Sequence, residues 1–384
     1  MASNLSEQQV CDWLRLIRTE NVGPATFRKL LNRYGSASAA LDALPFLSSR
    51  GGKNSNLKAP SKSDIESEIL VLQNMGARIV SAADDDFPDL LKHIASSPPL
   101  FSIMGGEKLN FEKTIAIVGA RNASASGQRL SKILANDLGE AGYTIVSGLA
   151  RGIDANAHAA SLKTGTIAVF AGGLNTIYPS ENIDLAKKIV ENGGALISEM
   201  GLNYSPRAKD FPRRNRLVSG LSLGVVIIEA AKKSGSLITA RFALEQNREI
   251  FAVPGSPLDP RAAEPNSLIR DGATLITSAD DIIESLSNTH PSDNLLFEDD
   301  TNSDFHFDFS SDNKTTQNSE PKNIEPSQSE REQLLNALSF TPVSVDEIIS
   351  QTQIKTLNIQ TILLELDIAG RIEWASGQLV SLKQ

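Results

Sequence analysis

The chain has 384 residues, 40% of them hydrophobic and 22% charged, a composition typical of two or three globular domains. A single cysteine, Cys11, excludes an intrachain disulfide framework and a zinc site of paired cysteines. The N-terminus lacks a basic start followed by an apolar run, and no stretch of about 18 apolar residues occurs. We therefore predict a cytoplasmic protein without a signal peptide or a transmembrane helix.

The net charge of −9 argues at first against nucleic acid, but the charge is unevenly distributed. Residues 288–329 carry nine acidic and two basic side chains, whereas residues 106–287 carry 19 acidic and 20 basic ones. Nucleic-acid binding needs a local basic patch rather than a basic protein. The middle of the chain therefore remains a candidate for this function.

The first 105 residues are predicted to form a small helical domain. In the segment 16–35, apolar residues recur at helical spacing on both sides of a turn at Asn21–Pro24, a pattern typical of a helix-hairpin-helix. Such a hairpin can offer backbone N–H groups to a phosphate. A plain packing role is the commoner alternative.

Residues 106–287 alternate between short β-branched apolar runs and helical patterns. This alternation predicts an α/β domain with an extended Rossmann-like parallel sheet, covered by helices on both faces. Ligands bind such sheets at the carboxyl ends of the strands. The predicted strands are Thr114–Val118, Thr144–Val146, Thr166–Phe170, Ala195–Ile197, Leu223–Ile228, Glu249–Val253 and Thr274–Ile276.

The last quarter of the chain has two parts. Residues 288–329 are rich in Asp, Asn, Ser, Thr and Pro and are predicted to be an acidic, disordered linker. Residues 330–384 show three helical patterns and a two-stranded wing turned at Gly377, which predicts a winged helix. Its last helix, 357–370, has no Lys or Arg but has Glu365 and Asp367, so we expect a protein-interaction or accessory role rather than tight duplex binding.

The first candidate binding segment follows the strand that ends at Gly119. Backbone N–H groups at the start of the next helix are expected to face an anion. Arg121 stands where a dinucleotide-binding turn has its second glycine, so it obstructs a pyrophosphate while supplying a guanidinium suited to phosphate. Phosphate binding is therefore predicted, and an NAD-dependent oxidoreductase is disfavoured.

A second segment follows the next strand along the chain. Ser147 and Gly148 are expected to face the same crevice, with Asp154 as a helix cap or as the partner of Arg151. His158 has no obvious nucleophile partner in the sequence, so we interpret it as a packed helix residue rather than a catalytic base.

The densest basic cluster is the segment 209–216, KDFPRRNR, with four cations and one aromatic ring. Cations for phosphates and a ring for bases are what single-strand binding uses. A solvated helix start with internal ion pairs is the alternative, and Arg216 is a candidate partner for an internal acid such as Glu229. Ser234–Ser236 form a further possible phosphate cradle, and Tyr178 could stack on a base.

Six segments between residues 112 and 276 together resemble the DprA/Smf family: IVGARNASASG, SGLARGIDANAH, AGGLNTIYPSEN, FPRRNRLVSGLS, VVIIEAAKKSGSLITARFALEQNR and FAVPGS. The resemblance implies a SAM-like N-terminal domain, single-stranded-DNA binding and no catalytic activity, metal or cofactor. It also implies work beside single-strand-binding protein, protection of single strands, and loading of RecA recombinase in natural transformation. A homodimer with Asn266–Leu275 near its interface is expected.

Nine residues are the resulting candidates for DNA binding: Gly119, Arg121, Ser147, Gly148, Arg151, Lys209, Phe211, Arg213 and Arg214. The main rival is a nucleotide-acting enzyme related to the phosphoribohydrolases. Its Pro-Gly-Gly-x-Gly-Thr loop has its nearest match at residues 171–176, which lack the proline and the third glycine. A scaffold that recruits recombinase with little DNA affinity is a third alternative.

Overall fold

The computed structural model describes residues 5–52, 57–107, 109–232, 234–289, 326–375 and 378–383. The chain folds as two compact units, one of Ser67–Phe307 and one that combines Leu5–Glu66 with Asp308–Gln384. Most of the predicted linker at 288–329, and the predicted wing turn at Gly377, lie outside the described residues. Within the described ranges, no helix is long and apolar enough to cross a membrane.

The first unit contains a nine-stranded sheet of order β1-β2-β6-β5-β4-β3-β7-β8-β9. Its seven strands from β3 to β9 run parallel and correspond to the seven predicted strands, which are confirmed. Their β-branched residues suit strands that are buried on both faces. The bounds are β3 Thr114–Gly119, β4 Thr144–Ser147, β5 Thr166–Val169, β6 Ala195–Ser198, β7 Gly224–Ile228, β8 Glu249–Ala252 and β9 Thr274–Leu275.

Two further strands, β1 (Ala77–Ser81) and β2 (Leu100–Gly105), extend the sheet beyond β6 and run antiparallel. The sheet therefore begins well before the predicted boundary at residue 105, and the first 105 residues are not one helical domain. Antiparallel strands need no crossover helix. For that reason this pair lacks the strand–helix alternation that marked the other seven strands in the sequence.

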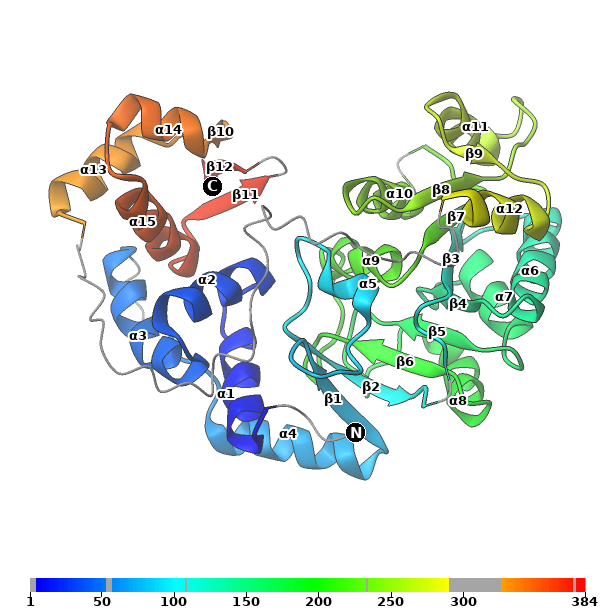
Figure 1. Ribbon diagram of the computed structural model, residues 1–384, viewed down its shortest axis with the longest axis horizontal. Coiled ribbons are helices and arrows are strands. Elements are labelled where there is room, and N and C mark those ends of the chain that lie inside the picture. Colours follow the sequence, from blue (N-terminus) through cyan, green and yellow to red (C-terminus); the bar gives the residue numbers. More distant parts are fainter. Residues whose placement is uncertain are drawn as a thin grey trace. The chain divides into compact units, whose positions relative to one another are not determined.

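Helices cover both faces of the sheet (Figure 1). On one face lie α6, α7, α8 and α12, and on the other α5, α9 and α10. The bounds are α4 Lys62–Asn74, α5 Asp89–Lys92, α6 Ala125–Glu140, α7 Ile153–Ala160, α8 Ile183–Glu191, α9 Asp210–Gly220, α10 Gly235–Glu245, α11 Ala263–Arg270 and α12 Ala279–Thr289, with short 3₁₀ turns at Ser180–Asn182 and Pro260–Ala262.

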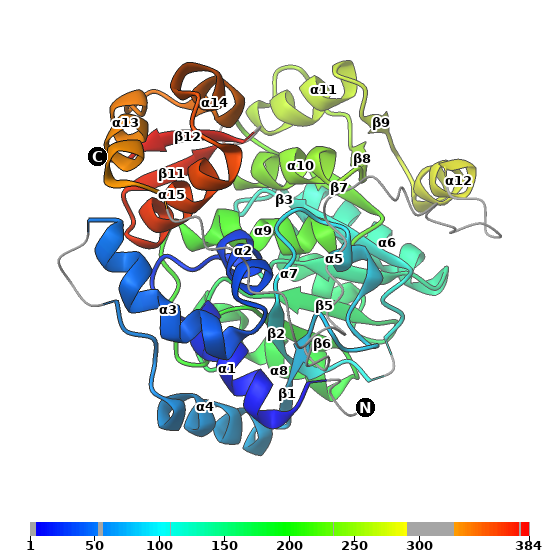
Figure 2. The ribbon, with the colours of Figure 1, turned by 60° about the vertical axis from the view of Figure 1, so that its left-hand side comes forward.

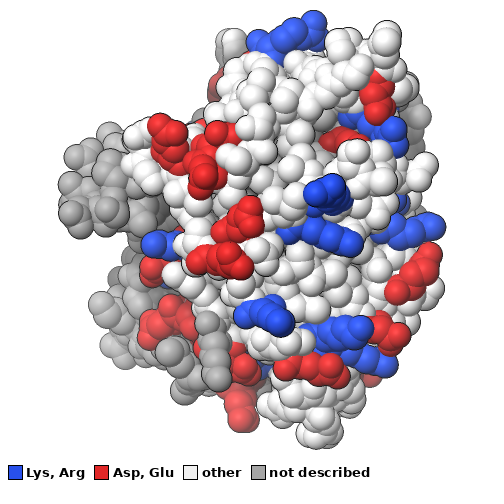
Figure 3. All heavy atoms as spheres, turned by 90° about the vertical axis from the view of Figure 1, so that its right-hand side faces the viewer, with Lys and Arg blue, Asp and Glu red and all other residues white. Residues whose placement is uncertain are grey.

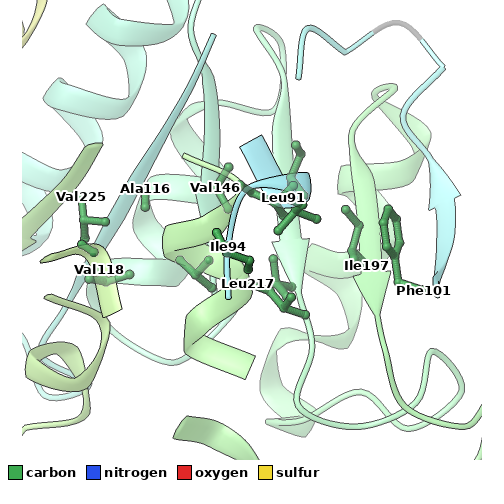
Figure 4. Packing of buried hydrophobic residues seen from close by; sticks show 14 of the residues in the cluster. Leu91, Ile94, Phe101, Ala116, Val118, Val146, Ile197, Leu217 and Val225 are labelled. Carbon is green, nitrogen blue, oxygen red and sulfur yellow. The ribbon is translucent and has the colours of Figure 1, made fainter. Parts of the chain in front are cut away.

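The alternating direction of strand side chains explains this layering. Ile115 of β3 packs towards α6 and α7, whereas Ala116 and Val118 pack towards α9. Figure 4 shows the second layer, where Leu217 of α9 and Ile94, just after α5, lie over the strands. The core thus holds α9 and α10 firmly across the strand ends, where ligands of such sheets bind.

The second unit combines the two ends of the chain. Its N-terminal helices are α1 Glu7–Ile17, α2 Pro24–Tyr34 and α3 Ala37–Arg50. Its C-terminal part is a winged helix made of α13 Gln328–Ala337, β10 Val343–Ser344, α14 Val345–Thr352, α15 Thr356–Ile368, β11 Ile372–Ala375 and β12 Leu379–Leu382. The winged helix is confirmed, and β10 adds a third strand to the predicted two. Helix α15 packs against α2 and α3 (Figures 1 and 2).

Candidate nucleic-acid interface

A cavity of about 810 Å³ opens in the first unit at the carboxyl ends of β3 and β4. This is the crevice in which parallel sheets bind ligands. Five segments contribute to its lining, within residues 118–122, 148–154, 211–218, 231–239 and 259–261. Segments that are distant in sequence are therefore brought to one place by the order of the strands.

The cavity brings together five of the nine predicted site residues, namely Gly119, Arg121, Gly148, Phe211 and Arg214. The other four lie outside its lining. Ser147 is fully buried, and its hydroxyl donates to the carbonyl of Ile117 at 2.6 Å rather than facing the crevice. That part of the prediction is wrong, because the last residue of a buried strand turns its side chain into the sheet layer.

Arg121 and Phe211 form a stack at the cavity. The guanidinium carbon of Arg121 lies 5.3 Å from the ring centroid of Phe211. The ring of Tyr178 also packs edge-on against Phe211, and the two ring centroids are 5.6 Å apart. Arg121 is exposed and Phe211 is half-buried, so a cation and an aromatic face are offered to solvent together. This pairing suits a phosphate beside an unstacked base.

Arg214 forms the floor of the cavity rather than its rim. Its side chain is buried, and Nη1 donates to the carbonyl of Val169 at 2.7 Å. Burial lowers the pKa of Arg214 to about 10, against the opposing charge of Asp154, so the guanidinium stays charged at neutral pH. A larger residue in place of Gly148 would displace Arg214, because an added Cβ would lie 2.0 Å from its Nη1.

Asp154 fixes the turn after β4. Its Oδ2 accepts hydrogen bonds from the backbone N–H groups of Gly148 at 3.1 Å and Ala150 at 3.3 Å. Burial raises the pKa of Asp154, while the charge of Arg214 and these bonds lower it. Arg151, the alternative partner, instead meets Glu181 at 3.6 Å, with both side chains more than half exposed.

His158 is fully buried, and its Nδ1 lies 2.7 Å from Oγ1 of Thr166. Burial, and secondly the charge of Arg214, lower the pKa of His158 to about 3. The ring is therefore neutral and out of reach of a ligand, which confirms its interpretation as a packing residue. In the part of the chain that the structure describes, no cluster of three or more His, Cys, Asp or Glu side chains is placed to hold a metal ion.

Two helix starts at this edge of the sheet differ in what they hold. At α6, the backbone N–H of Ser124 donates to Oε2 of Glu229 at 2.8 Å, and the Ser124 hydroxyl donates to Oε1. The predicted anion site at α6 is therefore filled by the chain's own carboxylate. At α10, by contrast, Ser234–Ser236 line the cavity, and a Cβ built on Gly235 meets open space.

In the basic cluster 209–216, some cations are exposed and others form ion pairs within the chain. Arg216 and Arg213 both pair with the buried carboxylate of Glu199, Arg213 at 2.8 Å. The pairing of Arg216 with Glu229 is therefore wrong, although its pairing with an internal acid is right. Lys209 is exposed just before α9 and lies outside the cavity lining.

Two charged cavity residues, Asp259 and Arg261, were not singled out from the sequence, and Asn215 was included only as part of the segment 209–216. Asn215 donates to the carbonyl of Gly235 at 3.1 Å and so ties α9 to α10. Asp259 and Arg261 form a two-bond pair of 3.1 and 3.0 Å at the far wall. Nothing in their local sequence marks them, because their proximity to the cavity depends on the strand order alone.

The face shown in Figure 3, on the right of Figure 1, carries basic and acidic side chains that are interspersed. Its described residues form no continuous basic track for a phosphate backbone. The cavity, with its exposed arginine and its helix start, is thus the better candidate for contact with nucleic acid.

Residues 78–287 match the sequence model of the family described as DNA recombination-mediator protein A, which is more than half of the chain. The chain belongs to this family. Two further models match at the ends: a DprA-like N-terminal HHH domain at residues 7–70 and a DprA winged helix domain at residues 318–378. The residues matched by the first model therefore include all those that line the cavity.

Relatives agree with the assignment. Protein Smf of Escherichia coli (strain K12) is 43% identical over 232 residues, which cover 60% of this chain and 62% of that protein, less than two thirds of its length. Protein Smf of Synechocystis sp. is 30% identical over 391 residues, covering 95% of this chain and 96% of that protein.

Solved structures give the same family. DNA processing protein A from Streptococcus pneumoniae matches with a TM-score of 0.57 and 31% identity, over 73% of this chain and 98% of that chain. The Helicobacter pylori protein, described for its unique single-stranded-DNA binding mode, matches with a TM-score of 0.50 and 29% identity, over 56% of this chain and 96% of that chain.

The two terminal motifs of this family member contact each other within the second unit. Asn21 of the hairpin turn donates to the carbonyl of Ile368 at 3.2 Å, and Thr26 donates to Asp367 at 2.7 Å. Helix α15 is buried over most of its length. The helix with which winged helices often read duplex DNA is therefore covered here by the N-terminal helices.

Proposed function

We propose that this chain is a recombination mediator that binds single-stranded DNA in the cavity of its sheet domain and has no covalent step of its own. The observation that carries the proposal is the stack of Arg121, Phe211 and Tyr178 at the cavity. Family membership supports the mediator role, and the Helicobacter pylori relative is described for single-stranded-DNA binding.

In this proposal, different residues contact the phosphates and the bases of the strand. Arg121 and the start of α10 take successive phosphates, and Phe211 takes an unstacked base. The charged Arg214 lies in the floor of the cavity and adds to the positive potential there, while it keeps its hydrogen bond to the carbonyl of Val169. Duplex DNA is disfavoured because its bases are stacked and cannot reach Phe211.

The remaining predicted cations differ in availability. The pair of Arg151 with Glu181 is exposed, and such pairs contribute little, so Arg151 can exchange its partner for a phosphate. Lys209 is exposed and also available. Arg213 shares the buried Glu199 with Arg216, so we expect it to contribute less to DNA binding than Arg151.

The proposal extends to partners: protection of single strands beside single-strand-binding protein, loading of RecA recombinase during natural transformation or DNA uptake, and a homodimer. The dimer is proposed at the β9 edge of the sheet. At this edge, Leu275 of β9 is 49% exposed. An edge strand is also open to pairing with a second copy.

The test is a titration of fluorescent oligo-dT and the matching duplex across a salt series, using the full chain and the variant Arg121→Ala. We expect preference for the single strand, and a log–log salt slope that is shallower by about 0.7 in the variant because one phosphate contact is lost. The matched control is Arg241→Ala, which removes the same charge from an exposed position outside the cavity lining. Equal effects of the two variants would contradict the proposal.

A further inference from the structure

The carboxylate of Glu229 occupies a position that anions occupy in related architectures. In doubly wound sheets, a ligand phosphate binds at the start of the helix that follows the first parallel strand. Here that helix is α6, and both carboxylate oxygens of Glu229 accept from Ser124, one from its backbone N–H at 2.8 Å and one from its hydroxyl. The N-cap residue of α6 is thus already bound to an anion.

The surrounding chain is fitted to this carboxylate. Glu229 has a φ of 51°, in the left-handed region that is unfavourable for a residue with a Cβ. At position 127, an added Cβ would lie 2.6 to 2.8 Å from the carboxylate atoms, so a larger residue there would displace the carboxylate. Strained backbone together with a vacated side-chain position indicates that the carboxylate has a role beyond solvation.

The neighbouring wall of the cavity carries an ion pair of its own, whose cation, Arg261, also interacts electrostatically with Glu229. The backbone N–H of Ala230, next to Glu229, donates to the carbonyl of Arg261 at 2.7 Å. The guanidinium of Arg261 is bound twice by Asp259, at 3.1 and 3.0 Å. On this side the cavity lining therefore carries one carboxylate and one cation that bind each other, whereas Arg121 and the start of α10 line it elsewhere.

We propose that Glu229 is a specificity-determining residue that excludes the phosphates of free nucleotides from the start of α6. This inference rests on the proposed single-strand binding. A dinucleotide or nucleotide that needs the α6 site is rejected by the resident carboxylate. A DNA strand needs only the separate phosphate contacts at Arg121 and α10, so it is accepted.

The test compares the full chain with Glu229→Gly, Glu229→Ala and Glu229→Gln. Glycine and alanine empty the position, and glycine also relieves the left-handed backbone. Glutamine removes the charge but has nearly the same shape and still fills the position, so it is the shape-matched control. Binding of inorganic phosphate and of thymidine monophosphate is measured by calorimetry, oligo-dT binding by anisotropy, and folding by circular dichroism.

We expect the glycine and alanine variants to bind phosphate and thymidine monophosphate about tenfold more tightly than wild type, as for one new helix N-terminal anion site. The glutamine variant should stay close to wild type. An equal gain in the glutamine variant, or no gain in a folded glycine or alanine variant, would overturn the inference. Failure of the wild type to bind oligo-dT would instead overturn the proposed function, and it would leave the phosphate comparison between the variants interpretable.

Discussion

Two regions of the chain carry patterns that are typical of DNA binding, and they end up in opposite situations. In the sheet domain, the strand ends open into a cavity with Arg121 exposed beside Phe211. In the second unit, the hairpin of α2 and the last helix of the winged helix contact each other. A motif in a sequence thus predicts a fold element, but its availability for a ligand depends on what packs against it.

The composition of α15 explains the difference. Buried residues lie on all sides of this helix, with Ile359, Ile362 and Leu366 on the side of the winged-helix core. On the other side, Thr361 accepts from Arg33 at 2.6 Å, and Gly51 packs so closely that a Cβ would lie 2.2 Å from the carbonyl of Glu365. Within the second unit, this helix thus packs against the N-terminal helices of its own chain.

The largest effect is expected for Arg214→Met in the cavity floor. This change removes the 2.7 Å hydrogen bond to the carbonyl of Val169 and the charge that opposes the effect of burial on the pKa of Asp154. Losing a buried hydrogen bond of a charged group costs about 1.5–3 kcal/mol of unfolding free energy. Urea denaturation followed by circular dichroism should show a destabilised sheet domain. Both tryptophans of the chain, Trp13 and Trp374, lie in the second unit, so the fluorescence transition should stay where it is.

The matched control for Arg214 is Arg207→Met, because Arg207 is exposed and its guanidinium contacts the nearby side chains of Tyr204 and Asp210. Its denaturation curve should stay close to that of the wild type. If Arg214→Met unfolds at the wild-type urea concentration, Arg214 does not stabilise the cavity floor.

The next largest effect sharpens the contrast between the two regions directly. Phe211→Ala should weaken oligo-dT binding by about 1–3 kcal/mol, because one base loses its stacking surface. The salt slope should stay unchanged, since no phosphate contact is removed. Phe340→Ala, at a 63% exposed phenylalanine of the second unit, is the control and should leave binding unaltered. Equal losses in both variants would place the strand elsewhere.

Much of this fold could be predicted from the sequence, because local patterns specify it. Seven parallel strands follow from β-branched runs separated by helical patterns, and the winged helix follows from three periodic segments and a wing. The strands β1 and β2 could not be found in this way, since β1 pairs with β2 and β2 pairs with β6 in antiparallel fashion, which requires no crossover helix.

The site was only partly predictable, for a different physical reason. Glycines and basic residues after strand ends marked Gly119, Arg121 and Gly148, which line the cavity in the structure. The partners of the charged groups were not marked, because an ion pair such as Glu199 with Arg216 depends on the packing of α9 across the strands. Sequence could show that charges gather, but not which of them neutralise one another.

A smaller effect is expected from Thr26→Val at the contact of α2 with α15. Removal of the hydroxyl takes the 2.7 Å hydrogen bond from Asp367 and should cost the second unit about 1 kcal/mol. Tryptophan fluorescence during urea denaturation measures this loss, and oligo-dT binding should not change. Thr341→Val, at an exposed threonine of the same unit, is the control. A loss of oligo-dT affinity in Thr26→Val alone would mean that the second unit takes part in strand binding.

The smallest effect concerns pH and the same contact. Burial raises the pKa of Asp367, although Thr26 and the charge of Lys29 oppose the shift. Because its folded pKa is above its unfolded one, Asp367 contributes stability at acidic pH that is lost as the pH rises through the folded pKa. Asp367→Asn keeps an acceptor for Thr26 and removes this titration. The free energy of unfolding of the variant should therefore rise relative to that of the wild type as the pH is raised from about 4, the ordinary pKa of an aspartate, towards 7. Tryptophan fluorescence during urea denaturation measures this difference. A constant difference across that range would show that α2 and α15 do not hold this carboxyl away from water.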